Sequence, residues 1–503
     1  MNLTSRGKIF LVICILSFIF SYFIITLNDF PHLGMSASLL LFALFSYKYK
    51  EVKNPDTKLY LVFSLLFSIL IFIRSEPLIS FLNLAAALIF GFLMLLPSQK
   101  QNLGFTDYIY APFLFVIKCI FTKSDYYLEF KRKKENSGMV KITEVVFGIL
   151  ITIFLLVVVL PLLSSANPIF KKVVLDFWNL LGLENLLNNI GFESVFIFFL
   201  RMAFFFLFIY MIPKVITLIN KSSDYSLPLP FKQESFPLLI PKVILAIILI
   251  IFFITQIQFY FATEETLKNL GFSHSQRTRE VFAQLSLVAL IVVLFIYNSR
   301  QRNKFNQLIN WLLGMQGIFL TLMAFKSDFE YINAWGLTYK RLYGLAFATW
   351  ITGIFIILFK NFRHKDEAML FVRKSIIFSG VILLMVGVLN FDYLIYHFQK
   401  AKTGQGIDYT FLSTLSADSF SYRDQILKLE EMSDEDSYSQ DVYDNKNPLI
   451  IVHKIENLQE KYSRFDLRTL SLFDFMQYQQ IKSQDTKKLR TRYEIKPPSQ
   501  LMR

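Results

Sequence analysis

The stretch from Asp328 to Tyr343 concentrates residue types that can carry chemistry. It places two carboxylates, two cations, several aromatic side chains and one glycine between two long apolar runs. Carboxylates beside an arginine can exchange protons, hold a cation or form a structural ion pair. The sequence therefore makes this connection the first candidate for a functional site, with Asp328, Glu330, Trp335 and Arg341 as its members.

Polar residues also gather at the ends of other apolar runs that we expect to reach the same membrane face. These further candidates are Gln256, Tyr260, Arg279, Glu280, Gln284, Asn390 and Asp392. Residues from distant segments at one depth could build a ligand-binding or partner-binding site. The alternative stays open, because aromatic residues at span ends are ordinary interfacial anchors and carboxylates near arginine are ordinary ion pairs.

No familiar catalytic template occurs in the sequence. The five histidines are scattered, and there is no His-Glu-x-x-His motif, phosphate-binding glycine loop or Gly-x-Ser-x-Gly turn. Cys14 and Cys119 lie far apart in apolar runs, where a cysteine usually serves as a small buried hydrophobe. We therefore expect no metal and no cofactor, and the catalytic residues of any reaction stay unknown.

The elements that would position these candidates are membrane-spanning helices. The chain has 503 residues, of which 54% are hydrophobic and 18% charged. The apolar residues form blocks of about 15 to 25, the length that crosses roughly 30 Å of hydrocarbon. The blocks predict eleven spans at Ile9–Leu27, Leu33–Tyr47, Leu59–Ile73, Leu78–Leu96, Ile142–Leu163, Ser194–Ile219, Val243–Ala262, Phe282–Asn298, Asn306–Phe325, Tyr339–Phe359 and Ser375–Ile395. Tyr108–Phe121, which contains Pro112 and Lys118, is expected to lie at the interface.

The net charge of +14 does not indicate a nucleic-acid partner. The tail from Lys400 onward is neutral, so the whole excess lies in the membrane part. Lysine and arginine accumulate in cytoplasmic connections, and their distribution here predicts an amino terminus inside and a carboxyl-terminal tail outside. The expected location is a bacterial cytoplasmic membrane. The expected partners are the lipid bilayer and, at the outer face, an envelope protein or a lipid-linked molecule.

The spans and the tail together predict an all-α polytopic bundle in three parts. Residues 1–141 would form an N-terminal transmembrane region, residues 142–399 a core bundle, and residues 400–503 an external, mostly helical tail. Within the tail, Leu449–Gln480 has apolar residues at helical spacing, which predicts one or two amphipathic helices. Thr486–Arg503 shows no such pattern and is expected to be frayed.

Four stretches resemble a bacterial membrane family catalogued as domain of unknown function 4153/4173. They read LLSSANPIF at 162–170, TREVFAQL at 278–285 and YINAWGLTYKR at 331–341, and the fourth runs from NFD at 390–392 to DYTFLSTLSAD at 408–418. The resemblance covers about residues 142–418, with a weaker echo at 465–475. Asn167, Gln276 and Phe391 stand where the family usually has Asp, Glu and Pro, which weakens an acid–base role for the first two. The resemblance implies a multi-pass membrane protein with a shared outer face and no particular reaction.

Three functions remain compatible with these observations. The first is an envelope or sensory component whose polar outer face binds a partner or ligand. The second is a secondary transporter, for which Glu280, Asp328, Glu330 and Arg341 would form a gate or ion site. The third is an envelope enzyme acting on a lipid-linked substrate, with Asp328, Glu330 and Asp392 as its carboxylates.

Overall fold

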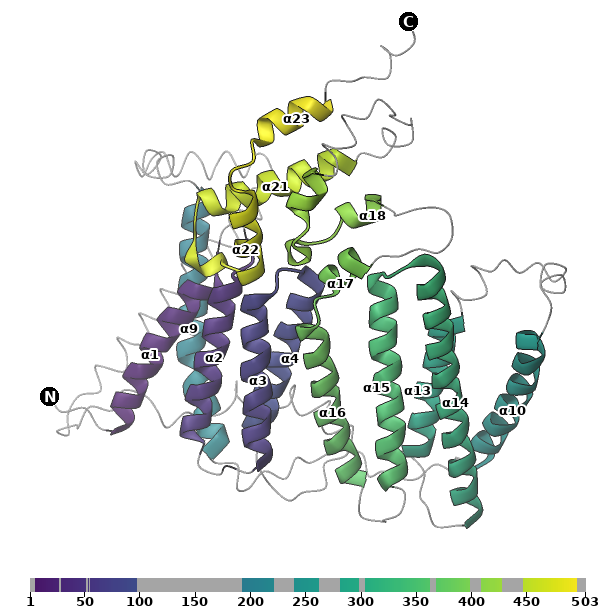
Figure 1. The fold of residues 1–503 in the computed structure, drawn as a ribbon. Coiled ribbons are helices and arrows are strands. Elements are labelled where there is room, and N and C mark those ends of the chain that lie inside the picture. The colour runs from purple at the N-terminus through teal and green to yellow at the C-terminus, as the bar shows by residue number, and fades with distance from the viewer. Residues whose placement is uncertain are drawn as a thin grey trace, which may run out of the picture.

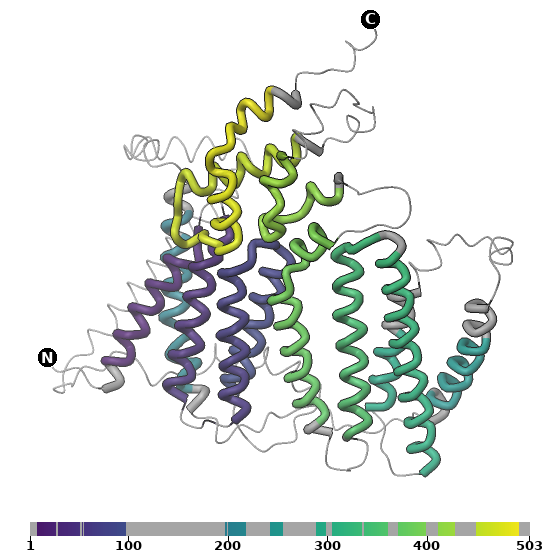
Figure 2. The backbone as a smooth tube through the Cα atoms, in the orientation of Figure 1, coloured from purple at the N-terminus to yellow at the C-terminus, as the bar shows by residue number. Residues whose placement is uncertain are grey.

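The computed structural model describes residues 5–26, 29–50, 53, 55–96, 192–220, 239–261, 281–297, 304–361, 368–398, 409–427 and 447–494. Within these ranges every regular element is a helix, which confirms the all-α prediction there. Figure 1 shows a row of long helices that carries a smaller helical unit on one end. The tube in Figure 2 shows the same arrangement without side chains.

The long helices form the bundle. They are α1 (Ser5–Ile24), α2 (His32–Tyr49), α3 (Pro55–Ile73), α4 (Pro77–Leu95), α9 (Phe192–Asn220), α10 (Leu239–Phe261), α13 (Val281–Tyr297), α14 (Lys304–Trp335), α15 (Tyr339–Asn361) and α16 (Ala368–Val388). The smaller elements are α17 (Phe391–Phe398), α18 (Tyr409–Ser413), η2 (Ala417–Ser419), α21 (Asn447–Ser463), η3 (Leu467–Thr469), α22 (Leu472–Ile481) and α23 (Thr486–Glu494).

Six helical segments in the described ranges are long and apolar enough to cross a membrane. They are Pro55–Ile73, Pro77–Leu95, Leu200–Thr217, Lys304–Asn333, Tyr339–Lys360 and Phe371–Val388. Lys8–Ile24, Lys242–Ile254 and Val288–Tyr297 are shorter apolar helices. Each predicted span except Ile142–Leu163 coincides largely with a helix, and that span and Tyr108–Phe121 lie outside the described residues. The count of eleven therefore stays a prediction.

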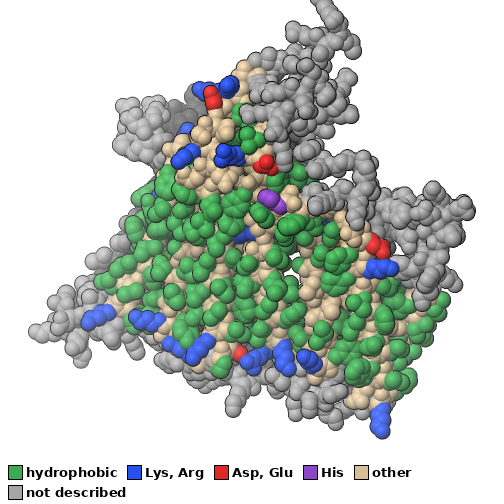
Figure 3. All heavy atoms as spheres, in the orientation of Figure 1, with side chains coloured by type: hydrophobic (Ala, Val, Ile, Leu, Met, Phe, Trp, Pro, Cys, Tyr) green, Lys and Arg blue, Asp and Glu red, His purple; other side chains and the backbone are tan. Residues whose placement is uncertain are grey.

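The outer surface of the bundle is apolar, as expected for helices in contact with lipid. Figure 3 shows hydrophobic side chains covering the visible face of the helices, with charged residues confined to the two ends. Phe18, Phe81 and Leu308 are each 63% exposed. A soluble protein rarely exposes so continuous an apolar surface, so this surface indicates membrane embedding.

Helix α16 packs against two groups of helices. On one side are α3 and α4, whose core contains Phe67 and Phe90; on the other are α10 and α13–α15, whose core contains Phe355. Glycine permits the close approach, because a Cβ on Gly387 would lie 2.7 Å from Asn83 Oδ1, and one on Gly317 would lie 2.1 Å from the Phe355 ring. Small residues at such positions are typical of packed membrane helices.

The stretch expected to connect the ninth and tenth spans is largely helical. Helix α14 continues for 32 residues to Trp335, so Asp328 and Glu330 lie on a helix rather than in a loop. At about 1.5 Å per residue it is roughly 48 Å long, more than the hydrocarbon thickness, so it extends beyond the bilayer. Nothing breaks the helix before Gly336, whose φ of 79° lies in the left-handed region that glycine adopts readily, and the chain turns there.

The last predicted span is broken where a continuous helix was expected. Helix α16 ends at Val388, and α17 starts at Phe391. Asn390 caps the new helix, since its Oδ1 accepts a hydrogen bond of 3.0 Å from the backbone N–H of Tyr393. Asparagine is among the residues most favoured at a helix start, so the Asn-Phe-Asp sequence itself accounts for the break.

The tail folds as a small helical unit. Its core contains Ile455, Tyr462 and Ile481 from α21 and α22, which confirms the predicted amphipathic helices. Leu489 joins this core from α23, so residues 486–494 are ordered although the sequence predicts a frayed end. The unit lies on the end of the bundle where α3 ends and α4 begins.

Candidate functional site

The connection between α3 and α4 is short and leads directly into a capped helix start. Pro77 stands at the first position of α4, where its fixed φ suits a helix start, and the Glu76 side chain accepts a 2.5 Å hydrogen bond from the backbone N–H of Ile79. Only Arg74, Ser75 and Glu76 lie between the two helices. This geometry holds two charged side chains at the end of the bundle that faces the tail.

Arg74 and Asp418 form a buried ion pair between the bundle and the tail. Arg74 Nε lies 2.8 Å from Asp418 Oδ2, and the two side chains are 1% and 0% exposed. Asp418 Oδ1 accepts hydrogen bonds from Ser75 N (2.9 Å) and Ser75 Oγ (2.5 Å), and Oδ2 accepts one of 3.4 Å from Glu76 N. The Arg74 guanidinium also lies 5.7 Å from the Phe473 ring of α22. One carboxylate thus binds the whole α3–α4 connection.

Asp392 links α15 to the same point. It is completely buried, and its Oδ1 accepts hydrogen bonds from Ser416 N (2.8 Å) and from the Tyr339 hydroxyl. The neighbouring Asn390 donates through Nδ2 to the carbonyl of Asp418 at 2.6 Å. Residues 390–392 and 416–418, the two ends of the fourth family-like stretch, are therefore in contact. We call the charged and aromatic residues at this contact the junction cluster: Arg74, Glu76, Tyr339, Asp392 and Asp418.

Buried polar atoms of the junction cluster remain without a hydrogen-bond partner among the described residues. They include Nη1 and Nη2 of Arg74 and Oδ2 of Asp392. The Arg74 Nε contact with Asp418 is a charge–charge contact without hydrogen-bond alignment. Buried groups of this kind cost free energy unless they are compensated, so the cluster is a polar site inside an otherwise apolar junction.

The cluster carries more carboxylates than cations. Burial, followed by the nearby charges of Asp392 and Asp418, raises the pKa of Glu76. Lys454 of α21 donates to the carbonyls of Ser413 (2.8 Å) and Leu415 (2.7 Å), and burial lowers its pKa to about 8. The negative charge of Asp392 opposes that lowering. Charged groups from four separate segments therefore interact across the junction.

Two of the predicted site residues, Asp328 and Arg341, lie beside the Gly336 turn. Asp328 is 6% exposed and its Oδ2 has no hydrogen-bond partner among the described residues. Arg341 is 9% exposed, donates to the carbonyl of Gly336, and lies 4.0 Å from the ring centroid of Tyr331. The positive charge of Arg341 acts on Asp328, yet Asp328 Oδ2 and Arg341 Nε have no hydrogen-bond partner among the described residues, so the two side chains are neighbours rather than a bonded pair.

The other predicted site residues contact neither the junction cluster nor Asp328 and Arg341 among the described side chains. Glu330 is 53% exposed and lies 3.7 Å from Lys326, which makes it a weak surface pair. Arg279 and Glu280 lie outside the described residues, and so do the side chains of Gln256, Tyr260, Gln284 and Trp335. The expectation that all these residues share one site stays a prediction.

Sequence reasoning missed Arg74, Glu76 and Tyr339, and it quoted Asp418 without placing it in the site. The Arg-Ser-Glu-Pro sequence at residues 74–77 is a recognisable helix-start signal directly after an apolar run. That signal identifies the turn. It does not identify Asp418 as the partner, because the two residues are brought together only by the fold.

The comparison with family models covers most of the chain. The model for "Domain of unknown function (DUF4153)" matches residues 61–426, a span that begins well before the expected start at residue 142. Every member of the junction cluster lies inside this match, whereas α21, α22 and α23 lie after it. No curated protein and no solved structure matches the chain. Because the family model covers more than half of its length, the chain belongs to the DUF4153 family.

Proposed function

We propose that this chain is a non-catalytic envelope or sensory component of a bacterial cytoplasmic membrane, and that its external tail binds a partner or ligand. The observation that carries the proposal is the buried Arg74–Asp418 ion pair, which fixes the folded tail to the end of the bundle. Binding energy at the tail can therefore be coupled to the packing of the membrane helices.

The charge distribution supports an amino terminus inside and a tail outside. Exposed cations gather at the helix ends opposite the tail: Lys48, Lys53, Lys58, Lys304, Lys360, Arg373 and Lys374. Figure 3 shows lysine and arginine side chains along this lower edge. Among the described carboxylates, Asp56 stands with them and pairs with Arg373. By the positive-inside rule this end is the cytoplasmic one.

The positions of the polar residues favour this function over the two alternatives. For an enzyme, the three carboxylates should share one site, yet Asp392 is fully buried against Ser416 and Tyr339, whereas Glu330 is 53% exposed beside Lys326. For a transporter, polar residues should line a path, yet Gln316 of α14 donates to the carbonyl of Ala246 in α10 at 3.1 Å. That contact is helix–helix packing.

The first experiment tests topology by cysteine labelling in intact cells. Single cysteines would replace Lys487 of α23 and Lys58 of α3 in a Cys14→Ser, Cys119→Ser background. A membrane-impermeant thiol reagent should label position 487 and leave position 58 unlabelled until the cells are opened. The reverse pattern would place the tail in the cytoplasm and overturn the proposed external role.

The second experiment tests the role of the tail in cells. A strain lacking the gene would be complemented with the wild type, with Asp418→Asn, or with the surface control Glu330→Gln, at matched membrane levels. The deletion should change sensitivity to osmotic or detergent stress. Asp418→Asn should fail to restore the wild-type response, whereas Glu330→Gln should restore it. A deletion defect confined to uptake of one solute would instead support the transporter.

A further inference from the structure

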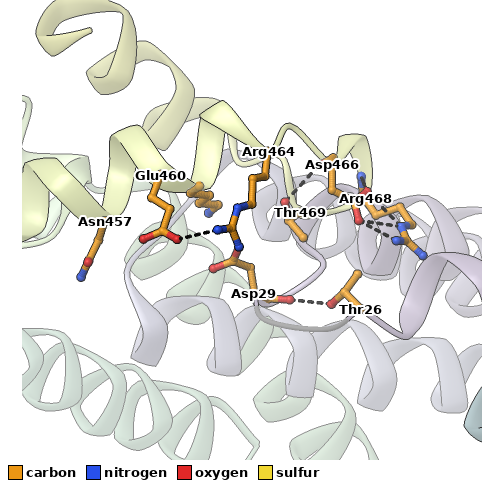
Figure 4. Close-up of a pocket in the computed structure, with 9 residues that line it drawn as sticks. Thr26, Asp29, Asn457, Glu460, Arg464, Asp466, Arg468 and Thr469 are labelled. Carbon is orange, nitrogen blue, oxygen red and sulfur yellow. Dashed lines mark hydrogen bonds and ion pairs between the residues drawn. The ribbon is translucent and has the colours of Figure 1, made fainter. Parts of the chain in front are cut away.

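A polar cavity of about 470 Å³ lies between the tail and the connection from α1 to α2. Thr26 and Asp29 form its bundle side, and α21 and η3 supply its other side, including Glu460, Arg464 and Arg468. Figure 4 shows the Arg464 side chain extending from α21 toward Asp29, with Glu460 beside it. A cavity of this size is large enough for a small polar ligand.

The cavity opens at the end of a lipid-facing stripe. Ile15, Phe18 and Tyr22 of α1 recur at helical spacing and are 52%, 63% and 44% exposed. At the end of this stripe, Arg468 Nη1 donates to the carbonyl of Tyr22 at 3.0 Å, and its guanidinium lies 4.5 Å from the Tyr22 ring centroid. An acyl chain lying along α1 would therefore bring its headgroup to the wall of the cavity.

Apolar side chains of the tail continue the same surface. Phe465 and Leu467 flank the cavity residue Asp466 and are 53% and 54% exposed. Phe30, next to Asp29 on the bundle side, is 40% exposed. Exposed apolar residues next to cations are the usual composition of a surface that contacts the headgroup and upper acyl region of a leaflet.

The charges of the cavity indicate which headgroup fits. Arg468 is committed, since it binds Asp466 through contacts of 2.6 to 3.0 Å, and this bonding lowers the pKa of Asp466. Arg464 and Glu460 are only loosely paired, at 3.5 Å, and are 77% and 65% exposed. Lys461 also lines the cavity, but it is paired with Asp474 at 2.7 Å. The adaptable groups are thus one cation, Arg464, and two carboxylates, Glu460 and Asp29. They suit a ligand that carries both an anion and a hydrogen-bonding cation.

We infer that this cavity binds the headgroup of a phosphatidylethanolamine-type phospholipid from the adjacent leaflet. Arg464 binds the phosphodiester, and Asp29 and Glu460 accept hydrogen bonds from the ammonium group. A phosphatidylcholine headgroup has no N–H donor for these carboxylates, and a phosphatidylglycerol headgroup has no cation. The inference rests on the membrane location in the proposed function and is independent of its partner-binding role.

The test measures lipid binding to the purified full-length protein in detergent by native mass spectrometry. Phosphatidylethanolamine, phosphatidylcholine and phosphatidylglycerol of equal chain length would be titrated, with glycerophosphoethanolamine as the soluble ligand. Phosphatidylethanolamine should bind most tightly. Arg464→Gln or Asp29→Asn should weaken it about tenfold, the effect of losing one charge-assisted hydrogen bond. Lys487→Gln removes an exposed cation of α23 away from the cavity and should leave the affinity unchanged.

Each other outcome overturns the inference. Equal or tighter binding of phosphatidylglycerol, together with no effect of Asp29→Asn, would show a simple anion site. Equal affinity for glycerophosphoethanolamine would show a soluble ligand rather than a lipid. No preference among the three lipids would show that the cavity does not select a headgroup. Because binding is measured in detergent, these results do not depend on the cell-labelling experiment, so the two proposals can fail separately.

Discussion

The substitution Asp418→Asn removes the central charge of the junction cluster with almost no change in shape. Asparagine keeps one oxygen, which can still accept the hydrogen bonds of Ser75. The side-chain NH₂ of the asparagine, however, would take the place of Oδ2, which in the wild type faces Arg74 and accepts a hydrogen bond from the backbone N–H of Glu76. Hydrogen-bond donors would then face each other at both contacts. Arg74, at 1% exposed, would lose the one ion-pair contact that it makes among the described residues.

The expected cost in free energy follows from the loss of that buried contact. Removing one partner of a buried ion pair usually costs about 3 to 5 kcal/mol. Since about 1.4 kcal/mol corresponds to a factor of ten in an equilibrium constant, the lower figure increases the detached population of the tail more than a hundredfold. Hydrogen exchange of the η2 amides measures this population directly, because local opening limits their exchange.

Two further variants make the result decisive. The double substitution Arg74→Met, Asp418→Leu removes both charges and should recover much of the lost protection, as uncharged replacements of buried pairs usually do. Glu330→Gln is the matched acid-to-amide control at an exposed pair and should change stability by less than about 1 kcal/mol. If Asp418→Asn leaves η2 exchange within twofold of the wild type, the ion pair does not hold the tail and our reasoning is wrong.

Two other predictions concern packing and pH. Gly317→Ala places a Cβ 2.1 Å from the fully buried Phe355 ring, so the variant should lose about 1 to 3 kcal/mol of stability and melt at a lower temperature in detergent. The control Thr349→Ala, on the exposed face of α15, should have little effect. Equal melting temperatures for the two variants would contradict the packing argument. Burial lowers the folded-state pKa of Lys454 from 10.5 to about 8, so the unfolded tail binds more protons than the folded tail between these pH values. The stability of the tail should therefore rise as the pH rises from about 8 toward 10.5. Lys454→Met should flatten this part of the plot of stability against pH, and an unchanged slope would contradict the role given to Lys454.

The helices could be predicted from the sequence because their signal is local. Each apolar block is long enough to define a span, and Gly336 marks a turn by its own conformational preference. The break at Asn390 was not predicted, because the apolar pattern continues through it. Even the errors are local in origin. The polar composition of residues 328–335 suggested a loop, although no Gly or Pro interrupts the helix before Gly336.

The junction cluster could not be predicted because its signal is distant in the chain. Arg74 and Asp418 are separated by more than 300 residues, and neither has a neighbouring motif that names the other. In the sequence, Arg74 is one of several cations in connections that we predict to lie outside, where snorkelling is the usual role. Its burial depends on α22 and η2 closing over it, which only the assembled fold determines.

The position of α16 has a mechanical consequence. It packs against α3 and α4 on one side and against α15 on the other, and its end leads directly into Asn390 and α17. Two residues of the tail segment 416–418 make the contacts. Asp418 accepts a hydrogen bond from Ser75 beside α3, and Ser416 donates its backbone N–H to Asp392, which also accepts from Tyr339 of α15. The segment therefore ties both helix groups together across α16. Movement of the tail would therefore move the end of α16. Loss of these hydrogen bonds would let the α3–α4 group and the α15 group separate at the end of the bundle that carries the tail and leave the opposite end in contact.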